Sequence, residues 1–116
     1  MSTILIVDDS MMTQMMLNVI IKEHFPDWTV IQAKDAEEAQ DKVAGVSFDY
    51  ATVDMNMPGL SGLELIPLLQ ISHPDAKIAL LTANIQHSIK SRAEDLGIEL
   101  LSKPIVESTI VKFLEQ

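Results

Sequence analysis

Short apolar runs alternate along the chain with longer segments in which apolar residues recur at helical spacing. The short runs are rich in β-branched and aliphatic residues and are bounded by polar or turn-forming residues, which is typical of buried strands. We expect strands at residues 3–9, 29–33, 49–54, 76–82 and 99–103.

The longer segments carry the signals that begin helices. Ser10 and Asp35 can each accept a hydrogen bond from a free N–H group of a first turn, and Ser61 or Gly62 opens the third segment. Pro67 lies too deep in that segment for a first-turn position, so it should kink the helix or remove one hydrogen bond. We expect helices at residues 10–24, 35–44, 61–71, 86–96 and 106–114.

Strands that alternate with helices predict an α/β fold, in which a parallel sheet is covered by helices. The chain has 116 residues, a common length for one domain, and contains no repeat, linker or low-complexity tail. We therefore expect a single doubly wound domain over residues 1–116. Because the chain stops soon after the last expected helix, we expect no attached output domain.

The amino-acid composition disfavours several classes of function. With 8 basic and 17 acidic residues the net charge is −9, which disfavours binding to nucleic acids and to anionic membrane surfaces. The absence of cysteine excludes disulfides, thiolate metal sites and a cysteine nucleophile. No apolar run has the roughly 18 residues that a membrane span requires, and no signal peptide is recognisable. We expect a cytoplasmic protein.

Side chains capable of chemistry follow four of the five expected strands. Asp8 and Asp9 end the first strand, Asp54 the third, Thr82 the fourth and Lys103 the fifth. In open α/β sheets, ligands bind at the carboxyl ends of strands, so these groups should converge. Three neighbouring carboxylates repel one another unless a cation shares the site, and all-oxygen ligation suits Mg²⁺.

A magnesium ion would leave Asp54 suited to attack phosphorus as a nucleophile. Lys103 and the Thr82 hydroxyl could then stabilise the transferred phosphoryl oxygens. Each residue also has a purely structural explanation: Asp8 and Asp9 can cap the next helix, Lys103 can form an ordinary ion pair, and Thr82 suits a strand. The combination of all five favours the chemical interpretation.

Four elements in this order resemble the receiver domain of response regulators, and the resemblance covers nearly the whole chain. They are the acidic pair Asp8-Asp9, the run DMNMPGLSG from Asp54, Thr82 with Ala83, and Lys103-Pro104. The resemblance implies a five-stranded sheet in the order 2-1-3-4-5, as in flavodoxin-like folds. It also implies a single-domain regulator of two-component signalling, similar to those of chemotaxis.

The same resemblance implies a role for each matching residue. Asp54 would be phosphorylated by a partner's phosphohistidine, supplied by a histidine kinase or a phosphotransfer protein. Asp9 and Asp54 would bind Mg²⁺ directly, Asp8 through water and Asn56 through its backbone carbonyl. Lys103 would pair with the phosphoryl group, and Thr82 would move toward it as a switch. Pro104 would follow a cis peptide bond.

One position departs from the family pattern. The family usually has Tyr or Phe three residues before the strand-five lysine, whereas this chain has Leu100. An interaction domain that keeps the fold without phosphorylation is therefore an alternative. A phosphohydrolase of the haloacid dehalogenase type is a poorer one, because its general acid would stand at Asn56, which cannot donate a proton in this way.

The first helical segment also contains apolar residues that could bind a partner protein. If Met16, Ile20 and Ile21 face the core, Met11 and Met15 form a partly exposed apolar rim beside the acidic pocket. We expect this rim to bind the helix that carries the phosphohistidine of the partner. An unidentified effector should bind the surface of the fourth helix, fifth strand and fifth helix, which includes Leu100. We expect the three histidines, His24, His73 and His87, to be solvated. Trp28 and Tyr50 should pack near the starts of strands.

Overall fold

The computed structural model describes residues 2–116, so the first residue of the expected domain lies outside the described part. Five strands and five helices alternate along the chain, as predicted. The strands are β1 (Thr3–Val7), β2 (Thr29–Ala33), β3 (Tyr50–Asp54), β4 (Lys77–Thr82) and β5 (Glu99–Ser102). The helices are α1 (Met11–His24), α2 (Ala36–Val43), α3 (Gly62–Ser72), α4 (His87–Leu96) and α5 (Glu107–Leu114).

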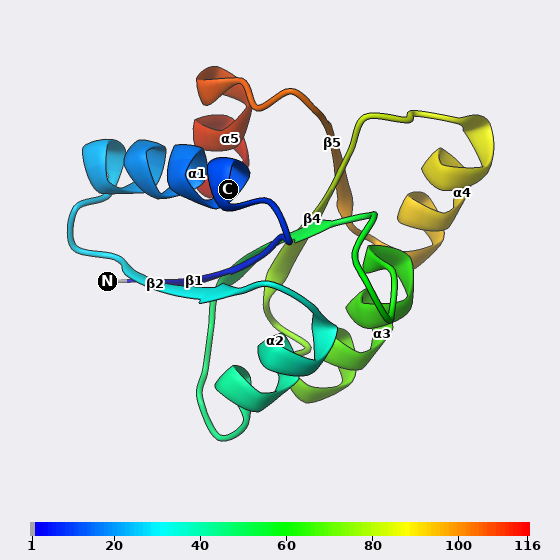
Figure 1. Ribbon diagram of the computed structural model, residues 1–116, viewed down its shortest axis with the longest axis horizontal. Coiled ribbons are helices and arrows are strands. Elements are labelled where there is room, and N and C mark those ends of the chain that lie inside the picture. The colour runs from blue at the N-terminus through cyan, green and yellow to red at the C-terminus, as the bar shows by residue number, and fades with distance from the viewer. Residues whose placement is uncertain (1) are drawn as a thin grey trace.

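All strand pairs are parallel, and the sheet order is β2-β1-β3-β4-β5, which confirms the predicted topology. Helices α1 and α5 cover one face of the sheet, and α2, α3 and α4 lie on the other (Figure 1). Successive strand residues point to opposite faces, so Ile4 and Ile6 pack with α1 and α5 while Leu5 and Val7 pack under α2 and α3. Within residues 2–116, no helix is both long and apolar enough to cross a membrane.

The predicted helix starts are confirmed by their hydrogen bonds. Ser10, Asp35 and Ser61 each accept a bond from the N–H of the residue three positions later. At α3 the bond is reciprocated, because the Glu64 side chain accepts from the Ser61 N–H at 2.9 Å. Pro67 lies inside α3, which continues to Ser72 although the proline supplies no N–H.

Two expectations about burial are wrong. Met16 is 42% exposed, and the inward face of α1 consists of Gln14, Leu17, Ile20 and Ile21. Ile20 and Ile21 face the core as expected, but Leu17 takes the place of Met16 because Leu17 lies four residues before Ile21, on the same side of the helix. His73 is half-buried: its ring stacks on Phe48 at 4.2 Å, and its Nε2 lies 2.6 Å from the Val46 carbonyl oxygen. Trp28 and Tyr50 stack at 5.1 Å near the strand starts, as expected.

Candidate functional site

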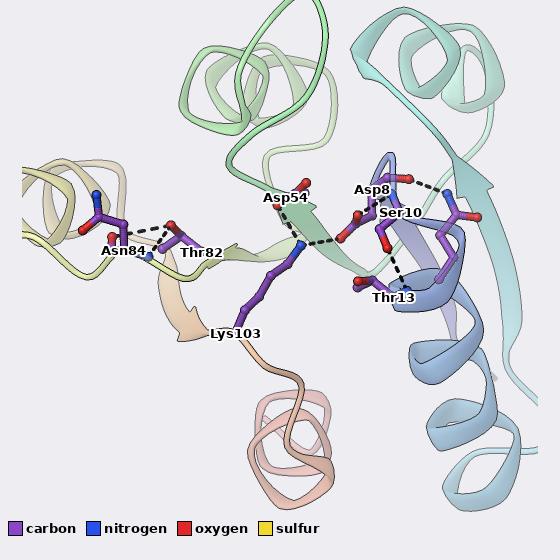
Figure 2. A network of polar contacts seen from close by, with 8 residues as sticks. Asp8, Ser10, Thr13, Asp54, Thr82, Asn84 and Lys103 are labelled. Atoms are coloured by element: carbon purple, nitrogen blue, oxygen red, sulfur yellow. Dashed lines mark hydrogen bonds and ion pairs between the residues drawn. The ribbon is translucent and has the colours of Figure 1, made fainter.

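An acidic pocket forms where the carboxyl ends of β1, β3 and β5 meet. Asp8 and Asp9 follow β1, Asp54 is the last residue of β3, and Lys103 follows β5. One carboxylate oxygen from each of the three aspartates lies within 4.8 Å of the others. Lys103 Nζ lies 3.2 Å from Asp8 Oδ2 and 3.0 Å from Asp54 Oδ1 (Figure 2). Four of the predicted residues are thus brought together.

Thr82 occupies a different place at this edge. Along β4 the side chains alternate, so Leu81 faces α1 and α5 whereas Leu80 and Thr82 face the opposite side. The buried Thr82 hydroxyl accepts a hydrogen bond from the Asn84 N–H at 3.1 Å and lies 3.5 Å from the Asn84 carbonyl oxygen. Figure 2 shows this pair separate from the ion pairs of Lys103.

Burial and charge act against each other in the pocket. Burial raises the pKa of Asp54 above its usual range, and the Asp8 carboxylate adds to this, while the hydrogen bond from Lys103 opposes it. For Lys103, burial alone would lower the pKa, but the contacts with Asp54 and Asp8 outweigh burial and raise it. Lys103 therefore stays protonated at neutral pH, and its ammonium group is in contact with two of the three carboxyl groups.

The donor set fits a divalent cation. Three carboxyl groups lie close together, and the structure places one ammonium group, that of Lys103, in contact with two of them. Within residues 2–116, the buried Asp8 Oδ2 has one polar contact, the Lys103 ammonium at 3.2 Å, so it keeps capacity for a further ligand. The ligand oxygens all lie within 4.8 Å of one another, and two oxygens on opposite sides of one Mg²⁺, with bonds of about 2.1 Å, lie about 4.2 Å apart.

The loop after Asp54 closes on itself, because the Gly62 N–H donates to the Met55 carbonyl oxygen at 2.9 Å. Pro58 precedes Gly59, whose φ of 79° suits the third position of a type II turn. Asn56 is exposed in this loop, two residues after Asp54. On the far side of the pocket, the peptide bond between Lys103 and Pro104 is cis.

The sequence profile of the response regulator receiver domain matches residues 4–115, which include every residue of the pocket. The chain belongs to the response regulator receiver domain family. It is 31% identical to the chemotaxis protein CheY of Listeria monocytogenes over 115 residues, 97% of this chain and 95% of that protein. Members of this family are phosphoacceptor signalling domains and not enzymes in the usual sense.

Solved structures of similar proteins share the fold of this receiver domain. Chemotaxis protein CheY4 of Vibrio cholerae superimposes with a TM-score of 0.89 at 27% identity, over 99% of this chain and 97% of that chain. A response regulator from Burkholderia pseudomallei gives a TM-score of 0.82 at 27% identity, over 98% of this chain and 66% of that chain. The latter structure contains a phosphorylated aspartic acid, a calcium ion and citrate.

The residues predicted to bind partners lie on two separate surfaces of the receiver domain. Met11 and Met15 on α1 are 68% and 63% exposed. Met15 lines a groove of about 700 Å³ between α1 and the start of α5, together with Met12, Met16, Val19, Ile20, Ile105 and Glu107. Leu100 on β5 packs with the α2–α4 side and borders a different groove beside α4.

Two residues that support the pocket were missed by the sequence analysis. Gln14 is buried under α1, with its side-chain amide on the Asp8 carbonyl. Nothing in the sequence marks it, because glutamine is common on exposed helix faces. Gly62 is the first residue of α3, where a Cβ would lie 2.5 Å from the Asp54 carbonyl oxygen. A glycine directly after a helix cap is a poor helix former, and this could have pointed to a close approach.

Proposed function

We propose that this receiver domain accepts a phosphoryl group on Asp54 from a phosphohistidine in a Mg²⁺-dependent reaction. The observation that carries the proposal is that Asp8, Asp9 and Asp54 lie together at the carboxyl ends of the strands, with Lys103 in contact with two of them, Asp8 and Asp54. An ordinary structural ion pair needs one carboxylate. A third carboxyl group close to such an ion pair raises the free energy of the resting pocket, and phosphoryl chemistry with a cation gives that arrangement a use.

In the proposed reaction, a carboxylate oxygen of Asp54 attacks phosphorus and forms the acyl phosphate bond. The bond from phosphorus to the histidine nitrogen breaks, and the imidazole leaves with the electron pair and takes up a proton. The Lys103 ammonium, 3.0 Å from Asp54 Oδ1, is placed to bind the oxygens of the transferred group. Thr82 can contribute only after its hydroxyl leaves Asn84, which makes it suitable as a switch.

Asp9 and Asp54 would hold the cation directly, Asn56 through its backbone carbonyl, and Asp8 through water. The cation would supply positive charge that offsets the carboxylates and the phosphoryl oxygens. Asp8 Oδ1 accepts a hydrogen bond from the Ser10 N–H at 2.9 Å, so Asp8 Oδ2 faces the pocket in a defined orientation. The acyl phosphate and divalent ion in the Burkholderia pseudomallei regulator support the same chemistry here.

Receiver domains of CheY-like proteins interact with histidine kinases and with downstream effectors. For this chain we propose a histidine kinase or a phosphotransfer protein as phosphodonor. The signal would then pass by phosphorylation-dependent docking of a separate effector on α4, β5 and α5. Leu100 borders the groove on that surface, in the position where an aromatic residue is usual.

Asp54→Asn tests the proposed function. Acetyl phosphate and Mg²⁺ are expected to add one phosphoryl group to the unaltered chain and none to the variant, measured by intact-protein mass spectrometry. Asp41→Asn, the same change on the exposed face of α2, should label normally. Labelling that persists in Asp54→Asn would overturn the assignment, and no labelling of the unaltered chain would favour the phosphorylation-independent interaction domain.

The rim of Met11 and Met15 should affect only phosphorylation by a protein donor. Changing both to Ser removes exposed apolar surface from the proposed docking site, so transfer from a phosphohistidine protein should slow by about tenfold. Labelling by acetyl phosphate, which needs no docking surface, should not change. The matched control is Ile71→Ser, because Ile71 is 79% exposed near the end of α3. Equal slowing with both donors, or by the control, would contradict the hypothesis.

A further inference from the structure

Gln14 is one of the few polar side chains that the fold buries. It is 6% exposed and belongs to a set of buried polar residues in the described chain that otherwise comprises Asp8, Thr52, Asp54 and Thr82. It lies in the first turn of α1, on the same inward face as Leu17 and Ile21. Burying an amide at this position costs free energy unless the group is hydrogen-bonded.

The Gln14 amide joins the ends of two strands. Its Nε2 donates to the Asp8 carbonyl oxygen at 2.6 Å and to the Ala33 carbonyl oxygen at 3.1 Å. The Asp8 N–H donates to the same Ala33 oxygen at 3.0 Å. Asp8, directly after β1, is therefore connected to the end of β2 through its own backbone N–H and through the Gln14 side chain.

These bonds leave Asp8 little freedom. Its N–H donates to the Ala33 carbonyl oxygen, its carbonyl oxygen accepts from Gln14, and its Oδ1 accepts from the Ser10 N–H. Figure 2 shows Asp8 and Ser10 side by side at the pocket. The remaining oxygen, Oδ2, lies in the pocket 3.2 Å from Lys103 Nζ. The Asp8 carbonyl also belongs to the peptide group that continues into Asp9, so fixing it limits how the Asp9 backbone can turn.

We infer that Gln14 is a positioning residue that orients the Asp8–Asp9 corner of the pocket for a cation. The inference rests on the proposed function, because the quantity it controls is Mg²⁺ affinity. Groups that orient metal ligands from behind change metal affinity by about 10–100-fold when they are replaced. Gln14 acts in this way through the backbone of Asp8, without contacting the cation.

Gln14→Met tests the inference, because Met has a similar length and removes the donor. Mg²⁺ titration followed by amide NMR should show an affinity at least about tenfold lower than that of the unaltered chain. Without Mg²⁺, hydrogen exchange of the Asp8 amide should be faster in the variant. The matched control is Gln70→Met, since Gln70 Nε2 donates to the Leu96 carbonyl oxygen at 2.8 Å, between α3 and the end of α4. The control should change neither measurement.

Normal Mg²⁺ affinity and normal Asp8 exchange in Gln14→Met would overturn the inference. Should this variant fail to fold, Gln14→Asn, which is too short to reach both carbonyl oxygens, is expected to change both measurements in the same direction, and unchanged values would again overturn it. Failure of the proposed function is distinguishable: the unaltered chain would then bind no Mg²⁺, while faster Asp8 exchange in Gln14→Met would still support the positioning role.

Discussion

Lys103→Met is expected to lower the free energy of unfolding by about 3 kcal/mol when no divalent cation is present, because breaking a buried ion pair leaves charges uncompensated. Asp8 and Asp54 are both buried, and each lies within ion-pair distance of the Lys103 ammonium group. Without that group, their mutual repulsion and their burial both favour unfolding. Urea titrations of the two proteins in the presence of a chelator would measure the difference.

The same variant should become more dependent on Mg²⁺. A cation bound at the three carboxylates would offset the charge that Lys103 leaves behind, so saturating Mg²⁺ should restore much of the lost stability. Labelling by acetyl phosphate should still fall by about 100-fold, because the cation cannot replace the positioned ammonium on the phosphoryl oxygens.

Lys22→Met provides the control for this prediction, since Lys22 is an exposed lysine in the last turn of α1. It should change stability by less than about 0.5 kcal/mol and leave labelling unchanged. If Lys103→Met proved as stable as the unaltered chain without cation, Lys103 would not be the group that compensates the pocket. The electrostatic account of the site would then be wrong.

Gly62→Ala is expected to destabilise the fold by about 2–3 kcal/mol, because overpacking at a rigid contact forces backbone shifts. The added Cβ would lie 2.5 Å from the Asp54 carbonyl oxygen and 2.7 Å from Leu80 Cδ1. The Leu80 methyl can rotate away, whereas the Asp54 carbonyl belongs to the central strand β3. The Gly62 N–H is also held by the Met55 carbonyl oxygen at 2.9 Å, so α3 cannot withdraw freely.

A displaced Asp54 should also react more slowly, since a misplacement of about 1 Å can cost about 100-fold in rate. Gly97→Ala separates this effect from a general loss of stability. Gly97 ends α4 with a φ of 71° and has open space around its Cβ position. Alanine there should cost about 1–2 kcal/mol through backbone strain alone and leave the labelling rate of the folded protein unchanged. Equal labelling rates in the two variants would contradict a positional role for Gly62.

Secondary structure was predictable because it depends on local signals. The starts of α1, α2 and α3 follow from Ser10, Asp35 and Ser61, whose side chains bond within their own first turns. The predicted ends of two strands were wrong: β1 ends at Val7 and β5 at Ser102, whereas the sequence predicted that they end at Asp9 and Lys103. Whether a residue extends a strand depends on its neighbour in the sheet, which the local sequence does not contain.

Burial was predictable only in part. Met16 and Leu17 are both apolar and adjacent, so the helical period alone does not decide which of them faces the sheet. His73 looked like a solvated loop residue, but the fold brings Phe48 and the Val46 carbonyl against it. In both cases the deciding contact comes from a segment distant in sequence.

The sequence by itself determined the alternation of strands and helices and the acidic and basic residues at the strand ends, because period, capping and residue type are properties of short segments. Tertiary structure alone decided that Lys103 bridges Asp8 and Asp54. It also placed Gln14 on the Asp8 carbonyl and Gly62 against the Asp54 carbonyl. These contacts depend on how parallel strands and their crossover helices are placed in space, which no local pattern encodes.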